Sequence, residues 1–459
     1  MQYNLYQKLL QFPSGGAQPV PDAASHCGFQ DHLTYVCQLK HGLRFSNGSP
    51  LTAADVVFSY RRVVKINASA GPSYQLSPLK SVSAPNPSTV VFTLKRPNPG
   101  WPLTVASLVG SIVPRGVFPA DKAMPSAKVI GSGPYKLSKF QQGQLISFKA
   151  NPHYSGPKPA NSGVIVQYYQ QPSAMRLALQ QKQIDAALAW RAFTPPDLKA
   201  LRGSHNIIKL KAADVRYLGF SFTQAPVKNL AVRQAIAYLI NRNVITHNVD
   251  GGLSTPLYSI VPTNIPGSIP SFRTQYGASP NPAKAKQVLQ RAGIHGPIKL
   301  TIWYTPTHWG PTSQDEFGEI QRELNSSGLF HASVNTTAWD QYEQSMTGAD
   351  YQAYETAWYP DFPDADQFLD PELNSTSAFS GKFSSKHVDQ LLAQEEGTPN
   401  QSVRPQIFAQ LQDIAAREVT QIPLFEANVI IAANKNLSSI AQSVDPIDFN
   451  LHLASWRKG

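Results

Sequence analysis

The chain has 459 residues, of which 42% are hydrophobic and 15% are charged, and its formal net charge is +11. This length exceeds what a single hydrophobic core usually supports, so we expect several domains. The basic residues form no long run, and pairs such as Arg61-Arg62 are the densest positions, which argues against nucleic-acid binding. No apolar run reaches the roughly 18 residues that a membrane-spanning helix needs.

The first residues do not form a secretory signal. Leu5, Leu9 and Phe12 instead have the spacing of an apolar helical stripe, which predicts an ordered element. We therefore expect that an export signal has been removed upstream of this sequence.

The two cysteines, Cys27 and Cys37, flank a segment that is typical of a strand reversal near residues 30–32. We expect the cysteines to lie opposite each other across a hairpin, where a disulfide is feasible. A disulfide would indicate an oxidising compartment. Two buried free thiols remain the alternative, because an unpaired cysteine behaves as a small apolar residue.

Helix starts are indicated by capping residues along the chain. Thr52 with Asp55 three residues later predicts a helix over 53–64, and Asn229 precedes an apolar helical stripe. Asn281 precedes a helix that Gly293 ends. Two more helices are predicted over 313–329 and 404–418, and strands over 88–97, 144–152, 215–222, 296–306 and 422–434. This interspersed pattern indicates an α/β or α+β protein with mixed sheets.

The sequence lacks the short motifs of common enzymes. It has no His-Glu-x-x-His, Gly-x-Ser-x-Gly or Walker-type segment, and the eleven His residues are scattered. The glycines of 131–137 (GSGPYKL) are followed at once by Pro134, which favours a structural turn. We therefore expect no catalytic residue, no metal and no cofactor.

The most unusual segment, 354–373, places four aspartates among aromatic residues. Such a loop can hold a cationic group of a ligand by charge pairing and ring-face attraction. For Asp364, Asp366 and Asp370 we favour the alternative, that they are turn or helix-capping residues. Asp361 is the candidate ligand-binding carboxylate, with a turn residue as its alternative.

Several segments, in one order along nearly the whole chain, resemble the family 5 bacterial extracellular solute-binding proteins. These are the oligopeptide, dipeptide and nickel receptors of ABC importers. The segments carrying the resemblance are 35–63 (with FSNG at the turn and TAADV at the helix start), 131–156 (GSGPYKL through NPHYSG), 180–188 (QQKQIDAAL), 215–245 (VRYLGFSF and VRQAI), 281–293 and the Trp-x-x-Asp region at 358–364.

The resemblance implies an α/β fold of two periplasmic-binding-protein-like lobes of type II, with hinge-joined mixed sheets flanked by helices. It also implies an additional inserted α+β domain. Lobe I would comprise 1–20, 131–243 and 432–459, the inserted domain 21–130, and lobe II 244–431.

The resemblance also implies where a ligand binds. Asp361 corresponds to the aspartate that often binds a peptide's α-ammonium. Trp358 and Tyr359 in the same loop, Trp190 and Phe193 after the 180–188 segment, and His308 and Trp309 complete the candidate ligand-binding residues. Packing in the core is the alternative for Trp358 and Trp190.

The chain departs from the family pattern in one informative place. Dipeptide receptors place an Arg for the ligand carboxylate where this chain has Thr307, His308 and Trp309. This departure indicates a longer ligand, or one without a carboxylate at that position. A weak substitution of the arginine by His308 is the alternative.

The function implied is capture of oligopeptides between two lobes and delivery to an ABC permease and its ATPase subunits. We expect a monomer outside the cell membrane, periplasmic or extracellular, attached only through a lipid anchor upstream of residue 1. A receptor for oligosaccharides or a metal chelate remains open, as do a peptide sensor without transport and an enzyme on a two-lobed scaffold.

Overall fold

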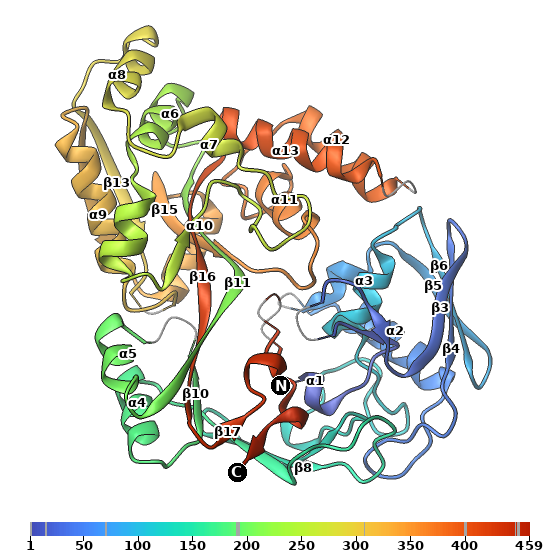
Figure 1. The fold of residues 1–459 in the computed structure, drawn as a ribbon. Coiled ribbons are helices and arrows are strands. Elements are labelled where there is room, and N and C mark those ends of the chain that lie inside the picture. Colours follow the sequence, from blue (N-terminus) through green and yellow to red (C-terminus); the bar gives the residue numbers. More distant parts are fainter. Residues whose placement is uncertain are drawn as a thin grey trace. The chain divides into compact units, whose positions relative to one another are not determined.

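The computed structural model describes residues 2–13, 16–68, 71–189, 193–306, 308–398, 402–445, 447 and 450–459. The chain divides into two compact units (Figure 1). Unit 1 comprises residues 1–185, 396–401 and 434–459, and unit 2 comprises 186–395 and 402–433. Among the described residues, no helix is long and apolar enough to cross a membrane.

Unit 1 contains a four-stranded antiparallel sheet in the order β3-β4-β6-β5. Helix α2 (Ala53–Ile66) contacts β5 and β6. The predicted helix start is confirmed, because the Asp55 carboxylate accepts hydrogen bonds from the Thr52 backbone N–H and hydroxyl, both at 2.9 Å. The strands of this sheet are β3 (Ala24–Asp31), β4 (Thr34–Leu39), β5 (Leu79–Asn86) and β6 (Thr89–Leu94).

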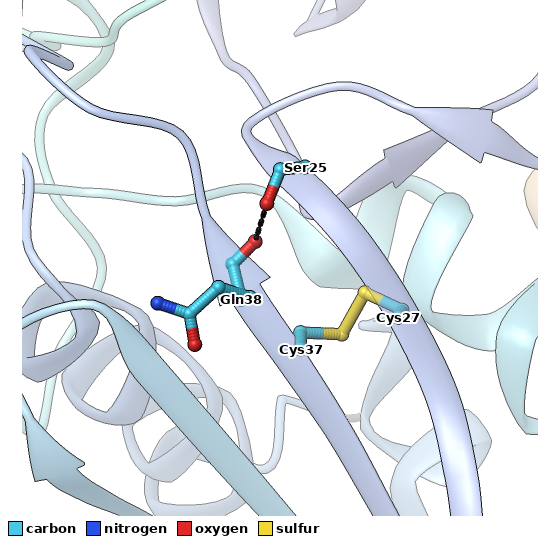
Figure 2. Close-up of a disulfide and its surroundings, with 4 residues drawn as sticks. All are labelled: Ser25, Cys27, Cys37 and Gln38. Atoms are coloured by element: carbon cyan, nitrogen blue, oxygen red, sulfur yellow. Dashed lines mark hydrogen bonds between the residues drawn. A yellow bond between two sulfur atoms is a disulfide. The ribbon is translucent and has the colours of Figure 1, made fainter.

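The hairpin β3-β4 carries both cysteines as directly paired residues (Figure 2). In the structure Cys27 and Cys37 form a disulfide, with their Cα atoms 4.1 Å apart. The Ser25 hydroxyl donates to the Gln38 carbonyl at 3.0 Å beside it. The disulfide therefore links two strands that backbone pairing already holds in register.

A second sheet of unit 1 has the order β7-β8-β9. Its strands are β7 (Tyr135–Gln141), β8 (Leu145–Ala150) and β9 (Gly163–Gln167). The other helices and strands of unit 1 are α1 (Gln2–Leu5), β1 (Leu10–Gln11), β2 (Val20–Pro21), α3 (Trp101–Ala106), α4 (Pro172–Gln180), β17 (Leu437–Ser438) and β18 (Arg457–Lys458).

The first helix is shorter than the apolar stripe of the sequence suggests. Helix α1 ends at Leu5, whereas Leu9 and Phe12 are buried in the extended segment that follows. The reason is backbone pairing, since the N–H groups of Asp22 and Ala24 donate to the Leu9 carbonyl. Hydrogen bonding with a distant segment thus overrides the local helical periodicity.

The glycines of 131–137 belong to a close backbone contact. A Cβ atom at Gly131 would lie 1.9 Å from the Leu5 carbonyl oxygen, so only glycine fits there. The Gly133 N–H donates to the same carbonyl at 2.9 Å. The segment is structural, in agreement with the absence of a phosphate-loop pattern.

The two ends of the chain meet within unit 1. The Asn4 side chain donates to the Leu451 carbonyl and accepts from the Leu453 N–H at 3.1 Å. Further along, the Asn161 amide donates to the carbonyls of Leu453 and Trp456. Buried backbone groups of the C-terminal segment are therefore satisfied by residues far away in sequence.

Unit 2 is built on a seven-stranded mixed sheet in the order β10-β16-β11-β15-β13-β14, with β12 paired to β16 (Figure 1). Strands β11 and β16 are almost wholly buried over most of their length, as expected for central strands. The strands are β10 (Ala186–Ala189), β11 (His205–Phe220), β12 (Ser254–Pro256), β13 (Ile298–Tyr304), β14 (Phe330–Thr336), β15 (Ala353–Trp358) and β16 (Gln421–Asn434).

The helices of unit 2 include those that the sequence predicts. The Asn229 and Asn281 side chains accept backbone hydrogen bonds at the starts of α6 and α8. The helices are α5 (Pro195–Leu201), α6 (Leu230–Leu239), α7 (Ser271–Tyr276), α8 (Pro282–Arg291), α9 (Ser313–Ser326), α10 (Trp339–Gly348), α11 (Asp366–Leu373), α12 (Lys386–Gly397) and α13 (Arg404–Glu418). The mixed α/β class is confirmed.

The boundaries of the compact units do not coincide with those of the predicted lobes. Residues 396–401, assigned above to lobe II, group with unit 1, and residues 186–243, assigned above to lobe I, group with unit 2. The reason lies in the sheet, because β10 and β11 from this range are strands of the same sheet as β13 to β16. The three-part division with an inserted domain at 21–130 stays a prediction.

Candidate ligand-binding site

Two neighbouring loops of unit 2 carry most of the candidate ligand-binding residues. Strands β13 and β15 pair in parallel, so their carboxyl ends point to the same edge of the sheet. The loop after β13 contains His308 and Trp309, and the loop after β15 contains Tyr359 and Asp361. Ligands of open α/β sheets bind outside the carboxyl ends of the strands, so this edge is the candidate site.

The loop after β15 begins at an anchored tryptophan. Trp358 pairs with Val215 of β11, and its indole N–H donates to the Gln367 carbonyl. Its ring contacts Phe379, with 5.2 Å between the ring centroids. These contacts fix the direction in which the chain leaves the sheet.

The far end of this loop is held by a buried ion-pair network. The Arg404 guanidinium donates two hydrogen bonds to the Asp364 carboxylate, at 2.9 and 3.0 Å, and a third to Glu395. The Asp364 carboxylate also accepts from the Asp366 N–H at 3.0 Å. A bidentate arginine–carboxylate pair fixes geometry as well as charge, so Asp364 is an anchor of the loop in addition to a turn residue.

Two more carboxylates, those of Asp366 and Asp370, lie around this network of Arg404, Asp364 and Glu395. Burial, and then the negative charges of Glu395, Asp364 and Asp370, raise the pKa of Asp366 well above its usual range. Burial also raises the pKa of Glu395 to about 7, which Arg404 partly opposes. One arginine cannot neutralise all of these carboxyl groups. The raised pKa values favour protonation of Asp366 and Glu395, which lowers the negative charge of the network.

Between the two anchors the loop exposes Tyr359 and Asp361. The Tyr359 side chain is 54% exposed, and the Asp361 N–H donates to the Gln367 side chain at 3.3 Å. Burial of part of the ring, followed by the charges of Asp361 and Asp214, raises the pKa of Tyr359. An exposed carboxylate beside a neutral phenol ring is suited to binding an ammonium group.

The loop after β13 rests on a cluster of aromatic rings. The His308 imidazole stacks on Trp339 with 3.5 Å between ring centroids, and meets Trp309 edge-on. Trp309 in turn meets Trp339 and Tyr342 edge-on, at 5.1 and 5.8 Å. Partial burial, and then the charge of Arg216, lower the pKa of His308, which favours the neutral imidazole.

A buried arginine, Arg216, lies beside the loop after β13, although the loop itself lacks the arginine that dipeptide receptors place there. Arg216 on β11 lies close to Trp309, with its guanidinium carbon 5.3 Å from the ring centroid, but its side chain is only 1% exposed. It faces Glu355 of β15, fully buried, at 3.5 Å. Ser313 donates to the same carboxylate at 2.8 Å. The arginine charge is thus matched by a protein carboxylate.

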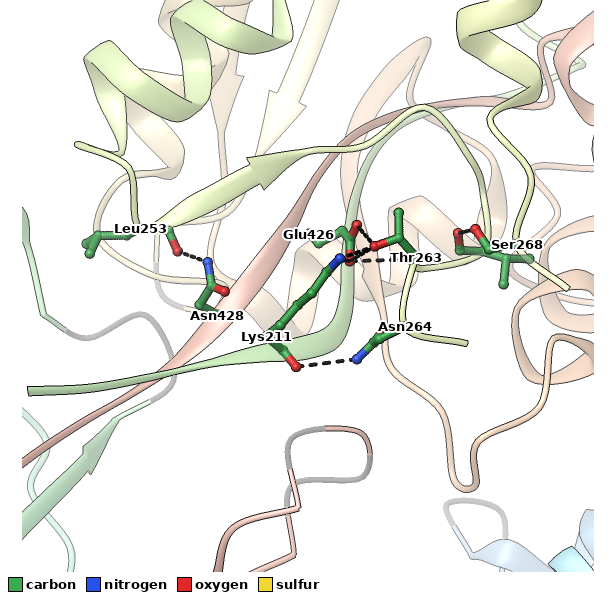
Figure 3. Close-up of polar contacts among 8 residues, drawn as sticks. Lys211, Leu253, Thr263, Asn264, Ser268, Glu426 and Asn428 are labelled. Carbon is green, nitrogen blue, oxygen red and sulfur yellow. Dashed lines mark hydrogen bonds and ion pairs between the residues drawn. The ribbon is translucent and has the colours of Figure 1, made fainter. Parts of the chain in front are cut away.

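A polar cluster that sequence reasoning missed lies on the neighbouring strands β11 and β16 (Figure 3). Lys211 of β11 lies 3.5 Å from the Glu426 carboxylate of β16 and contacts the Thr263 hydroxyl. Thr263 donates to Glu426 at 2.7 Å, and the Asn264 amide donates to the Lys211 carbonyl at 3.3 Å. The cluster ties the loop of residues 261–268 to the two long strands.

The remaining candidates come from the segment between β10 and α5. Phe193 is only 3% exposed and precedes Thr194, which caps α5. Trp190 and Thr307 lie outside the described residues. Their roles, like those of Asp361, Trp358, Tyr359, His308 and Trp309, stay predictions.

The charged residues that were missed had a signal in the sequence. Arg216, Glu355 and Glu426 each stand among mainly apolar neighbours in the buried part of a strand, and charged residues are almost never fully buried unless they are paired. Within the described part of the chain, no group of three or more His, Cys, Asp or Glu residues could hold a metal ion.

An open-sheet edge that carries an anchored acidic loop and an aromatic cluster is typical of a ligand-binding site. The chain belongs to the bacterial extracellular solute-binding proteins, family 5, whose model matches residues 18–380. This finding confirms the resemblance seen in the sequence. The family is one of binding proteins rather than enzymes.

The chain is similar over nearly its whole length to curated relatives. It is 27% identical to the "Probable D,D-dipeptide-binding periplasmic protein DdpA" of Escherichia coli (strain K12), covering 95% of this chain and 85% of the relative. It is 24% identical to the dipeptide-binding protein of the same strain, covering 96% and 87%.

Solved structures share the fold. The dipeptide-binding protein of Pseudoalteromonas sp. SM9913 in complex with Met-Leu matches with a TM-score of 0.85 at 19% identity, covering 100% of this chain and 95% of that one. NikA of Brucella suis in complex with Fe(III)-EDTA matches with a TM-score of 0.87 at 18% identity and the same coverage. These likenesses confirm the type II periplasmic-binding-protein fold.

Proposed function

We propose that this protein captures oligopeptides with a free N-terminus, and that Asp361 binds their α-ammonium group. The observation that carries the proposal is the loop after β15. Its exposed carboxylate stands between two anchors, the Trp358 indole and the Asp364–Arg404 pair. A loop held in its binding conformation before the ligand arrives loses little conformational entropy on binding.

The relatives support a peptide ligand. Their names describe binding of dipeptides and glutathione, and one solved structure of the fold, AppA of Bacillus subtilis, contains a nonapeptide. Because Arg216 is already matched by Glu355, we propose that the ligand's C-terminal carboxylate is not bound beside Trp309. The aromatic cluster would instead contact a side chain of a peptide longer than two residues.

In the proposed cycle the peptide binds between lobe I and lobe II, and its contacts with both favour the closed form. The closed form then delivers the peptide to an ABC permease, while the ATPase subunits supply the energy. We propose a monomer that acts on the outer side of the cell membrane and is attached there through a lipid anchor.

Calorimetry with tripeptides to nonapeptides tests the proposal. Asp361→Asn is expected to weaken binding roughly tenfold to a hundredfold, because a charge-assisted hydrogen bond contributes about 1.5–3 kcal/mol. Acetylating the peptide N-terminus should weaken binding to the unaltered protein by the same factor as Asp361→Asn does. It should not weaken binding to the Asp361→Asn variant any further. Asp340→Asn, an exposed aspartate on α10, serves as the matched control. Equal affinity for acetylated and free peptides would exclude ammonium recognition by Asp361.

A receptor for oligosaccharides or a metal chelate is the second candidate. The stacked rings of His308 and Trp339 favour it, because sugar rings and flat chelates bind to aromatic faces. In the same calorimeter, cello-oligosaccharides and Fe(III)-EDTA serve as the competing ligands. Binding of either one, unaffected by Asp361→Asn and without any peptide binding, would establish this candidate in place of the first.

A further inference from the structure

A groove of about 630 Å³ lies on unit 1, along α2 and beside β5 and residues 115–120. Four basic side chains line it, and they are Arg61, Arg62, Lys65 and Arg115. Between them the lining is small or apolar, with Val57 and Phe58 contributed by the helix. The groove therefore combines an apolar surface with a concentration of positive charge.

The helix explains why these side chains gather. Phe58, Arg61, Arg62 and Lys65 are spaced at i, i+3, i+4 and i+7, which places them on one face of α2. The groove therefore gathers four of the chain's 40 Lys and Arg residues along one helix and the segment beside it.

Hydrogen bonds fix two of the cations without neutralising them. Arg62 donates to the carbonyls of Pro119 and Lys122, at 2.8 and 2.7 Å, and Arg61 donates to the Val82 carbonyl at 2.9 Å. Among the described residues, none of the four basic groups of the groove forms an ion pair. Their positive charge is thus not matched by a carboxylate of the described chain, although Arg62 also lies over the Phe118 ring, 5.4 Å from its centroid.

The one carboxylate on the adjoining turn of α2 is already engaged. Asp55 is 5% exposed, and it accepts hydrogen bonds from Thr52 and from the Arg115 backbone N–H at 3.2 Å. These bonds direct it to the helix start and hold residue 115 beside the groove.

We infer that the groove of Arg61, Arg62, Lys65 and Arg115 docks an acidic segment of a partner protein, one that carries at least two carboxylates around an apolar side chain. Charge complementarity selects the acidic residues, and the Val57–Phe58 surface accommodates the apolar one. The concave shape favours a polypeptide segment over a bilayer, because a flat membrane reaches the rim and leaves the apolar floor uncovered. This surface is separate from the residues proposed above to bind peptide ligands.

The test uses a fluorescein-labelled probe, acetyl-Glu-Leu-Glu-Asp-Leu-Glu, and the full chain at about 50 mM salt, where charge attraction is weakly screened. The acetyl group removes the ammonium that Asp361 would bind. Fluorescence anisotropy should show saturable binding that Asp361→Asn leaves unchanged. Lys65→Gln with Arg115→Gln should weaken it about fivefold to tenfold, because each ion pair contributes modestly. Both residues donate no side-chain hydrogen bond in the described structure, so the fold is spared.

The matched control is Lys139→Gln with Lys149→Gln, which removes the same charge from the β7-β8 hairpin of the same unit. An equal loss of affinity in this control would overturn the inference, because binding would then depend on net charge alone. Absence of saturable binding to the unaltered chain would also overturn it. Vesicles with about 30% phosphatidylglycerol are measured in parallel. If the groove variant lost vesicle binding and kept probe binding, the occupant would be a membrane and the inference wrong.

Discussion

The buried carboxyl group of Glu372 on α11 is expected to make the stability of unit 2 depend on pH. The side chain is 3% exposed, and its Oε1 atom has no hydrogen-bond partner among the described residues. Burial raises the pKa of Glu372 to about 8, which the neighbouring Gln421 partly opposes. We predict that Glu372→Gln, which keeps the shape and removes the titration, stabilises the protein increasingly as pH rises.

The sign follows from proton binding. Above pH 4.5 the unfolded chain releases the proton while the folded chain keeps it until about pH 8, so the free energy of unfolding falls across this window. The penalty from this one group is about 0.8 kcal/mol at pH 5 and about 4 kcal/mol at pH 8, taking about 1.4 kcal/mol per pKa unit. The advantage of the variant should therefore grow by about 3.5 kcal/mol between the two pH values.

Urea denaturation at pH 5 and pH 8 measures this difference. Tryptophan fluorescence reports mainly on unit 2, which contains Trp303, Trp309, Trp339 and Trp358. Glu343→Gln, at an exposed position on α10, is the control for loss of one negative charge. If the variant and the unaltered chain differed by the same free energy at both pH values, the assignment of a buried neutral carboxyl group to Glu372 would be refuted.

Two further predictions concern one link within each unit, the disulfide of unit 1 and the Arg404 ion-pair network of unit 2. Replacing Cys27 and Cys37 by Ser should lower the free energy of unfolding of unit 1 by about 3 kcal/mol, because the unfolded chain is no longer restricted by a closed loop of this length. A loss below about 1 kcal/mol in urea denaturation would contradict this. Arg404→Gln should cost about 3–5 kcal/mol, because Asp364 and Glu395 would stay buried without their cation. Thermal unfolding should show no such loss for Arg417→Gln, whose side chain is 60% exposed, and equal losses would argue against the buried network.

Local features of the fold could be predicted from the sequence because their causes are local. The helix starts at Thr52, Asn229 and Asn281 depend on side chains that cap the next few residues. Where a distant segment intervenes, helical spacing does not give a helix, as at Leu9, whose carbonyl accepts hydrogen bonds from the N–H groups of residues 22 and 24. Periodicity describes which side chains are buried, and hydrogen bonding decides whether the backbone is helical.

The candidate site was predicted only in part, for the same reason. The acidic loop around Asp361 is visible because its residues are contiguous. Its anchor Arg404 is 40 residues from Asp364, and the ring that supports His308 comes from Trp339 on another helix. Contacts of this kind follow from strand order and register, which a single sequence does not specify.

The assembly of unit 1 from three separate stretches of chain has a consequence for folding. The Asn4 side chain bonds to the backbone of Leu451 and Leu453, and Asn4 and Leu451 lie 447 positions apart in the sequence. Contacts between residues so far apart form slowly, because a long loop must close before they can be made. Unit 1 is therefore expected to complete its fold later than its local pieces, such as the β3-β4 hairpin, whose paired residues are close in sequence.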